Sequence, residues 1–280
     1  MKNKQAKKMH PNNNLNELTG DKWIYSTQSV LKTDYKKDIG FNLRKAHGAN
    51  KPPQLMKQLI EFFSKSGETV LDPFAGVGGT LLGATLSNRK AIGIEINKKW
   101  FNTYKEVCKS EGFKSQSFLV GDCLDIINKN IIIWKNKIDL ILTDPPYNVN
   151  LDKTMCNNKY PNKNRQSGFE YFSNIKEDFS NSKDYEEYLI RMKKFLSLSF
   201  SILKPFHYLV LILRNSYQNG EYIMTSSTIS EYAKDIGYIM KGEIIWYSNG
   251  NRLRPYGYPF VFVPNIVHHN ILIFRKEVAV

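Results

Sequence analysis

Residues 69–80 read Thr-Val-Leu-Asp-Pro-Phe-Ala-Gly-Val-Gly-Gly-Thr. The apolar run 69–71 predicts a short buried strand, and the glycine-rich stretch 72–80 predicts a tight turn into a helix that ends near residue 86. Glycine at such a turn permits a positive φ and lets the backbone approach a ligand closely. A purely structural strand-to-helix turn is also compatible with this stretch. A dinucleotide-binding fingerprint is disfavoured, because its third glycine would fall at position 81, which is leucine.

The alternation of strands and helices continues on both sides of this stretch. Further helices are expected over 53–64, 97–110, from 184 onward and over 226–236. Six further strands are expected at 90–96, 118–121, 138–143, 207–213, 239–247 and 270–275. Strands joined by helical crossovers form mainly parallel sheets. We therefore expect an α/β fold with a doubly wound, seven-stranded, mainly parallel sheet in a single domain spanning 18–280. Residues 148–183 form a loop insertion after the fourth strand, and residues 1–17 are expected to be a disordered basic arm.

Three acidic residues follow successive predicted strands. Asp72 ends the first strand, Glu95 ends the second, and Asp122 follows the third. The carboxyl ends of parallel strands meet at one edge of a sheet, where ligands bind near the point at which the strand order reverses. Each acid alone could be a helix N-cap. Together they indicate a nucleoside pocket, with Glu95 placed to accept both ribose hydroxyls.

With these residues the chain resembles the S-adenosylmethionine-dependent DNA amino-methyltransferases, over roughly residues 20–275. The resemblance implies a Rossmann-like methyltransferase fold and S-adenosyl-L-methionine as cofactor. It implies that the segment from Asp72 to Thr80 holds the methionine part, Glu95 the ribose and Asp122 the adenine amino group. Residues 47–52 resemble the segment that closes over the methionine end. The candidate cofactor-binding residues are Lys51, Pro52, Asp72, Phe74, Ala75, Gly76, Gly78, Thr80, Glu95, Ile96, Asp122, Cys123 and Asp144.

Residues Asp144, Pro145, Pro146 and Tyr147 follow the fourth strand and are the candidate catalytic residues. An exocyclic base amine is a poor nucleophile, because its lone pair is delocalised into the ring. A carboxylate and a backbone carbonyl that accept both N–H bonds would free that lone pair. Asp144 supplies the carboxylate, and Pro145 is the candidate carbonyl. The two prolines stiffen the loop, and the Tyr147 ring can stack on a base extruded from the duplex.

The tetrapeptide leaves several target groups open. Family members that methylate adenine N6 start it with Asp or Asn, whereas those that methylate cytosine N4 more often start it with Ser, so the resemblance favours adenine N6. An RNA methyltransferase of the guanine-N2 type stays an alternative, because it uses a similar tetrapeptide. Methylation of cytosine carbon 5 is disfavoured, because none of the three cysteines follows a proline. A non-enzymatic reading is a nucleic-acid-binding subunit with a vestigial pocket, which the complete set of acids argues against.

The charge of the chain favours a polyanionic partner. Forty Lys and Arg residues against 26 Asp and Glu residues give a formal net charge of +14. A solvated surface rich in lysine is the alternative reading. We expect double-stranded DNA with a flipped base as the partner. Two insertions, 148–183 and 248–266, combine cations with aromatic residues and are the candidate DNA-contact segments. Their candidate DNA-binding residues are Lys153, Lys163, Arg165, Arg252 and Arg254.

Composition excludes other classes of protein. Cys108, Cys123 and Cys156 form no CxxC pair, which favours a reducing cytoplasm over secretion. The longest apolar stretch, near 207–214, is too short for a membrane span, and the basic N-terminus has no apolar signal region. The adjacent His268 and His269 would point to opposite faces of a strand, so no metal site is expected. We expect a monomer or homodimer, with a cognate restriction endonuclease as a candidate second partner.

Overall fold

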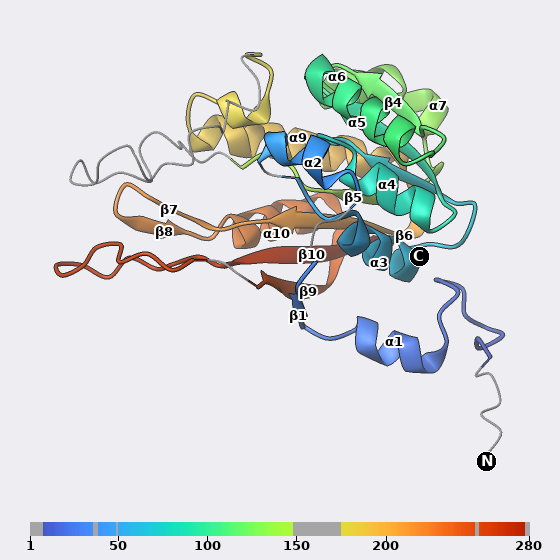
Figure 1. The fold of residues 1–280 in the computed structure, drawn as a ribbon, viewed down its shortest axis with the longest axis horizontal. Coiled ribbons are helices and arrows are strands. Elements are labelled where there is room, and N and C mark those ends of the chain that lie inside the picture. The colour runs from blue at the N-terminus through green and yellow to red at the C-terminus, as the bar shows by residue number, and fades with distance from the viewer. Residues whose placement is uncertain (1–7, 36–38, 49, 148–174, 250–251, 278–280) are drawn as a thin grey trace.

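The computed structural model describes residues 8–35, 39–48, 50–147, 175–249 and 252–277 (Figure 1). The helices are α1 (Gly20–Ser26), α2 (Phe41–Arg44), η1 (Lys45–His47), α3 (Pro53–Phe63), α4 (Gly79–Leu86), α5 (Lys98–Ser110), α6 (Cys123–Lys129), α7 (Ile131–Trp134), η3 (Phe179–Asn181), α9 (Tyr185–Ile202) and α10 (Thr225–Ile236). The strands are β1 (Val30–Thr33), β2 (Thr69–Asp72), β3 (Lys90–Glu95), β4 (Ser117–Val120), β5 (Ile138–Thr143), β6 (Leu203–Leu213), β7 (Ser216–Gln218), β8 (Glu221–Ile223), β9 (Tyr238–Ser248) and β10 (His268–Lys276).

The main sheet has the strand order β1-β9-β10-β6-β5-β2-β3-β4. Its pairs are parallel except where β10 lies antiparallel to β6 and β9. All seven predicted strands are present in a mainly parallel sheet, so the predicted fold class is confirmed. The sheet has eight strands rather than seven, because β1 adds to the edge of β9. Its four residues alternate between exposed and half-buried positions, and so short a segment gives no clear strand signal.

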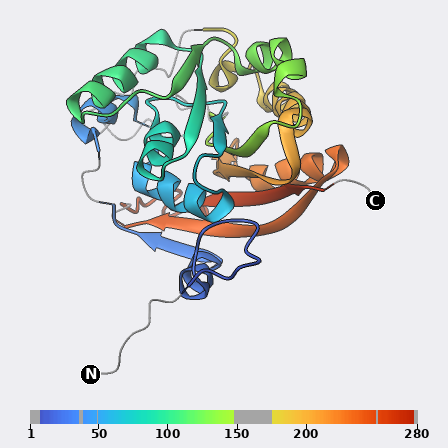
Figure 2. The same ribbon diagram turned by 90° about the vertical axis from the view of Figure 1, so that its right-hand side faces the viewer.

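Helices cover both faces of the sheet (Figure 2). Alternate residues of β2 and β5 enter different cores. Val70 of β2 packs in the core formed with α3, α4 and α5, whereas its neighbour Leu71 packs in the core formed with α6, α9 and α10. Leu140 and Ile141 of β5 divide in the same way. A strand that is buried on both faces has no polar side, which is why β5 reads as an uninterrupted apolar run.

The strand order reverses between β2 and β5. From β2 the chain adds β3 and then β4 on one side, and then returns to place β5 on the other side of β2. Val70 is paired with Leu140 and Leu71 with Ile141, so the two strands run side by side in the same direction. The loops that follow β2 and β5 therefore leave the same edge of the sheet at its switch point, where open α/β sheets bind ligands.

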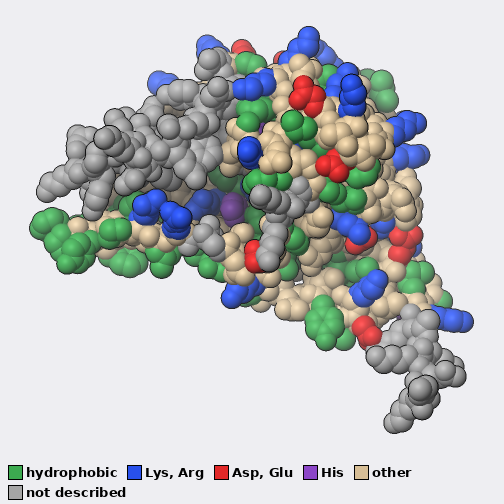
Figure 3. Space-filling model, viewed as in Figure 1, with side chains coloured by type: hydrophobic (Ala, Val, Ile, Leu, Met, Phe, Trp, Pro, Cys, Tyr) green, Lys and Arg blue, Asp and Glu red, His purple; other side chains and the backbone are tan. Residues whose placement is uncertain are grey.

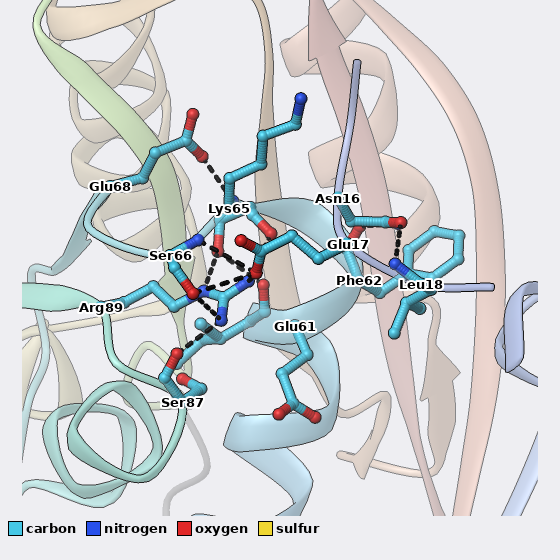
Figure 4. Close-up of polar contacts among 12 residues, drawn as sticks. Asn16, Glu17, Leu18, Glu61, Phe62, Lys65, Ser66, Glu68, Ser87 and Arg89 are labelled. Carbon is cyan, nitrogen blue, oxygen red and sulfur yellow. Dashed lines mark hydrogen bonds and ion pairs between the residues drawn. The ribbon is translucent and has the colours of Figure 1, made fainter. Parts of the chain in front are cut away.

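The prediction of a loose arm extending to residue 17 is wrong for its last residues (Figure 4). Asn16 is fully buried, and its side-chain amide donates to the Phe62 carbonyl over 2.7 Å. Glu17 pairs with the buried Arg89 guanidinium at 3.1 Å. These partners lie more than 40 residues away along the chain, and local composition does not reveal them. Residues 1–7 lie outside the described residues.

Two smaller features follow β6 and β9. Strands β7 and β8 form a separate two-stranded hairpin, which the sequence did not predict. Residues 252–266 connect β9 to β10 and carry most of the second predicted insertion. Residues 148–174 of the first insertion lie outside the described residues, so their predicted contact with DNA stays a prediction. None of the described helices has the length and apolarity that crossing a membrane requires.

Candidate active site

The glycine loop between β2 and α4 has the backbone that its sequence predicts. Gly76 and Gly78 have φ values of +49° and +78°, which L side chains rarely adopt. A Cβ on Gly78 would lie 2.2 Å from the Tyr104 ring, and one on Gly79 would lie 2.7 Å from the Lys51 carbonyl oxygen. The glycines therefore let the start of α4 pack directly against the chain at residue 51, which brings two predicted cofactor segments together.

Arg44, which was not among the residues predicted from the sequence, holds residues 50–51 in place. The guanidinium of Arg44, which is 1% exposed, donates to the Lys51 carbonyl, and also to Asn50 Oδ1 at 3.3 Å. Pro52 then precedes α3, whose first residue is Pro53. An arginine in a mainly polar stretch carries no local sign of burial, so only the fold identifies this role.

Asp72 joins the end of β2 to the end of β5. Its Oδ1 accepts hydrogen bonds from the Thr143 hydroxyl at 2.5 Å and from the Phe74 amide at 3.1 Å. Burial raises the pKa of Asp72 to about 6, hydrogen bonds from Thr143, Thr80 and Phe74 oppose that rise, and the nearby Asp144 charge adds to it. Thr143 immediately precedes Asp144, so the glycine loop and the candidate catalytic loop are neighbours at this edge.

Glu95 closes the other side of the glycine loop. Its two carboxylate oxygens accept one backbone amide each, from Gly76 and from Asn97, both at 2.9 Å. Burial raises the pKa of Glu95 to about 7, and these two amide bonds oppose that rise. A carboxylate oxygen has two lone pairs, so each oxygen of Glu95 can accept one more donor.

Asp122 lies at the start of α6, and both of its oxygens have partners. Oδ1 accepts from the Leu124 amide at 2.6 Å, so the N-cap role considered from the sequence is confirmed. Oδ2 pairs with Arg191 of α9 at 3.0 Å, and the Arg191 guanidinium lies 4.4 Å from the centre of the Phe179 ring. Sequence reasoning missed Arg191, because it approaches from a helix far along the chain. The predicted adenine contact of Asp122 stays a prediction.

Other predicted cofactor residues surround the same edge. The Phe74 ring packs against Phe179 and Phe195, with centroids 4.9 and 5.2 Å apart. Ala75 and Thr80 are buried. Cys123 is buried beside Asp122, and burial raises the pKa of its thiol well above the usual range, so the thiol stays protonated. Ile96, which is half-buried, follows Glu95 at the end of β3.

The candidate catalytic tetrapeptide forms a compact polar cluster with Lys51. Asp144 Oδ2 pairs with the Lys51 ammonium, and Asp144 Oδ1 accepts a hydrogen bond from the Tyr147 hydroxyl. Burial raises the pKa of Asp144, whereas the Lys51 charge and the two hydrogen bonds oppose that rise. Burial and the Asp144 charge raise the pKa of Tyr147 well above its usual value, so its hydroxyl remains a donor. The two prolines between Asp144 and Tyr147 in the sequence are covered to different degrees: Pro145 is buried and Pro146 is half-buried.

Two histidines line the site, one beside each loop. The His269 ring lies 6.3 Å from the Tyr147 ring and 4.8 Å from the Trp246 ring. Burial, Lys51 and Arg214 lower the pKa of His269 well below its usual value, so it is neutral at pH 7. His47 lies 3.1 Å from where a Cβ on Gly76 would be, and burial lowers its pKa to about 4.

The structure describes two of the five DNA-contact candidates. Arg252 and Arg254 are exposed on the connection between β9 and β10. Lys153, Lys163 and Arg165 lie outside the described residues. Among the described residues, Glu68, Asp139 and His207 could together hold a metal ion. Glu68 precedes β2, Asp139 lies at the start of β5 and His207 lies in β6, toward the opposite edge of the sheet. Asp139 already accepts hydrogen bonds from the Lys204 ammonium and the Thr69 amide.

Comparison with known proteins places this site in a family. The chain matches the family model described as DNA methylase over residues 1–106 and 138–279. Type II methyltransferase M.HindIII of Haemophilus influenzae is 52% identical over 56 residues, which are 20% of this chain and 18% of that protein. Type II methyltransferase M.HpaI of Haemophilus parainfluenzae is 42% identical over 91 residues, or 32% of this chain and 29% of that protein.

RNA-modifying proteins are also similar to the chain. A tRNA (guanine(10)-N2)-dimethyltransferase of Methanothermobacter thermautotrophicus is 29% identical over 98 residues, or 35% of this chain and 27% of that protein. The chain thus spans less than a third of the length of each of these three relatives. Among solved structures, TrmN from Thermus thermophilus shares the fold, with a TM-score of 0.51 at 15% identity over 84% of this chain and 52% of that one.

The family match covers both loops described above. It includes the glycine loop, Glu95 and the Asp-Pro-Pro-Tyr tetrapeptide, and it covers the larger part of the chain. Members of this family are methyltransferases that depend on S-adenosylmethionine. From the matched residues and the fold that carries them, we conclude that the chain belongs to the DNA methylase family.

Proposed function

We propose that this chain transfers a methyl group from S-adenosylmethionine to the exocyclic N6 of adenine in DNA. The observation that carries the proposal is the hydrogen bond from Thr143 to Asp72. It joins the last residue of β5 to the last residue of β2, so Asp144 stands beside the glycine loop at the switch point of the sheet. A methyl donor in the loop and an amine at Asp144 would then be neighbours, which supplies much of the rate.

The residues present fit S-adenosylmethionine. The left-handed glycines leave the backbone at 76–78 without side chains, and each Glu95 oxygen keeps a lone pair for a ribose hydroxyl. We assign the methionine part to the loop from Asp72 to Thr80 and to Lys51 and Pro52. We assign the ribose to Glu95 and the adenine to Ile96, Asp122 and Cys123. The cofactor supplies an electrophilic methyl carbon bonded to a sulfonium.

Asp144 acts as the acceptor for the target amine. A carboxyl group accepts N–H bonds most strongly when it is ionised, and burial alone would favour its protonated form. Lys51 opposes that effect by pairing with Oδ2, and the Tyr147 hydroxyl donates to Oδ1. These two partners hold the carboxylate in place before a base arrives, which is the preorganisation that electrostatic catalysis needs. The proton released from the amine after transfer leaves to solvent.

Guanine N2 in RNA is the second candidate target, because a tRNA guanine-N2 methyltransferase is among the similar proteins. Cytosine N4 is a third, since the same family model covers it. The same polar cluster could accept a planar amine on any of these bases.

One experiment separates these targets. The protein is incubated with isotopically labelled S-adenosylmethionine and either unmethylated bacterial DNA or unmodified tRNA, and the products are digested to nucleosides. We expect label in N6-methyladenine from DNA, incorporated about 100-fold or more slowly when Asp144→Asn replaces the wild type. Label in N4-methylcytosine or in N2-methylguanosine would reassign the target. No label in either nucleic acid, together with no heat of cofactor binding, would favour a non-enzymatic subunit.

A further inference from the structure

The connection between β9 and β10 exposes an aromatic tip. We call residues 252–266 the aromatic arm; it projects beyond the body of the sheet (Figure 1). Tyr258, Phe260 and Phe262 are 80%, 84% and 86% exposed, and Val261 is 63% exposed. Figure 3 shows apolar side chains gathered at the end of this projection with basic side chains next to them. Soluble proteins rarely leave consecutive large apolar residues in water without a binding role.

The arm is built to hold this tip in one shape. The Arg254 amide donates to Asn265 Oδ1 and the Asn265 side-chain amide donates to the Arg254 carbonyl, both at 2.8 Å. At the tip, the amides of Phe260 and Val261 donate to the Gly257 carbonyl at 2.8 and 2.9 Å. Gly257 has a φ of +73°, and a Cβ there would lie 2.2 Å from the Val261 carbonyl oxygen. The tip is therefore a tight turn with a fixed shape.

The charge of the arm selects its partner. Arg252 and Arg254 are exposed at its base, and residues 249–268 contain neither Asp nor Glu. Cations beside an apolar tip match a nucleic acid, in which phosphates surround stacked bases. A partner bound through apolar contacts alone would have no need of the arginines.

The root of the arm adjoins the candidate active site. His269, one residue into β10, lies beside Tyr147. Phe262 and His268 are six positions apart along the chain, a stretch that spans at most about 20 Å when extended. DNA rises about 3.4 Å per base pair, so this reach corresponds to about six base pairs. The tip can therefore touch the same duplex within a few base pairs of a base held at Asp144.

We propose that the aromatic tip inserts Phe260 or Phe262 between base pairs of duplex DNA, as an apolar wedge beside the flipped base. The inference rests on the proposed function, because it takes DNA as the substrate. Wedges of this kind unstack a base step and so lower the cost of extruding a neighbouring nucleotide.

The test measures binding to two DNA probes by fluorescence anisotropy. One is a short mixed-sequence duplex with a central abasic site, and the other is the same duplex fully paired. Because the abasic site is already unstacked, we expect the wild type to bind it about tenfold more tightly. The double variant Phe260→Ser, Phe262→Ser should lose that preference and bind the paired duplex within about threefold of the wild type. Arg252→Gln with Arg254→Gln should weaken binding to both duplexes alike.

A matched control removes two exposed apolar residues elsewhere. Ile132 and Ile133 of α7 are 86% and 61% exposed, and Ile132→Ser with Ile133→Ser should change neither affinity. The proposal is overturned if the wild type shows no preference, or if the phenylalanine variant keeps it. It is also overturned if sedimentation shows a dimer that the phenylalanine variant dissociates, which would assign the tip to a second copy of the chain.

The binding assay needs neither cofactor nor methyl transfer, so the two proposals can fail separately. A wild type that labels DNA but shows no preference refutes the wedge alone. If the wild type prefers the abasic duplex but labels only RNA, the proposal that DNA is the methylation substrate fails and the proposed wedge does not.

Discussion

Replacing Lys51 by methionine isolates the electrostatic role of its contact with Asp144. The side chains of Lys51 and Asp144 are only 7% and 15% exposed. Methionine keeps much of the length and apolar stem of lysine but removes the charge, so a buried carboxylate would be left without its counter-ion. Removal of one partner from a buried pair costs about 3–5 kcal/mol, and we expect a loss of that size in the free energy of unfolding at pH 8.

The loss of the Lys51 charge also predicts how the stability of the Lys51→Met variant changes with pH. Because the Lys51 charge opposes the rise that burial gives the pKa of Asp144, its removal raises that pKa further. The folded variant then binds more protons than its unfolded chain at neutral pH, so its stability increases as the pH falls. The difference in the free energy of unfolding between the wild type and Lys51→Met should therefore be largest at pH 8 and should become smaller toward pH 5.

Urea unfolding followed by tryptophan fluorescence measures this effect, provided that the m-values agree. The double variant Lys51→Met, Asp144→Asn should be about 2 kcal/mol more stable than Lys51→Met at pH 8, because it leaves no buried charge unpaired. Lys57→Met is the matched control: it breaks an exposed pair with Glu61 at 3.7 Å, worth about 0.5 kcal/mol or less. Equal urea midpoints for Lys51→Met and the wild type at pH 8 would refute the reasoning, as would a double variant no more stable than Lys51→Met.

Three further predictions concern the site. With the pKa of Glu95 raised to about 7, its ionised form is lost below that pH, so S-adenosylmethionine should bind about tenfold more weakly at pH 6 than at pH 8. Titration calorimetry measures this affinity, and the Glu95→Gln variant should bind S-adenosylmethionine weakly at both pH values. An affinity of the wild type that does not change with pH would show that Glu95 does not bind the ribose. Asp144→Asn should lower the rate of methyl transfer by about 100-fold or more and leave cofactor affinity within a few-fold, so a large loss of affinity would show that Asp144 belongs to the cofactor site instead. Gly78→Ala should destabilise the fold by about 1–3 kcal/mol, because of its positive φ and the 2.2 Å approach to Tyr104, whereas Gly242→Ala, with open space around it, should cost much less in the same urea assay.

The sequence alone determined seven strands of the main sheet, the glycine loop and the acids that end successive strands. These signals are local: apolar runs such as 138–143 mark buried strands, and glycine marks positions that need a positive φ. Parallel strands place their carboxyl ends at one edge, so Asp72, Glu95 and Asp144 could be assigned to one site without coordinates.

Only the tertiary structure decided which side chains from distant segments meet. Lys51 pairs with Asp144 across 93 residues, and Arg191 reaches Asp122 across 69. Strand β1 joins β9 at the sheet edge, where the Trp246 indole donates to Thr33 across 213 residues. Contacts at such separations leave no periodicity in the sequence near either partner. They arise because the sheet and its helices close around a common core, which fixes each side chain relative to residues that the local chain cannot specify.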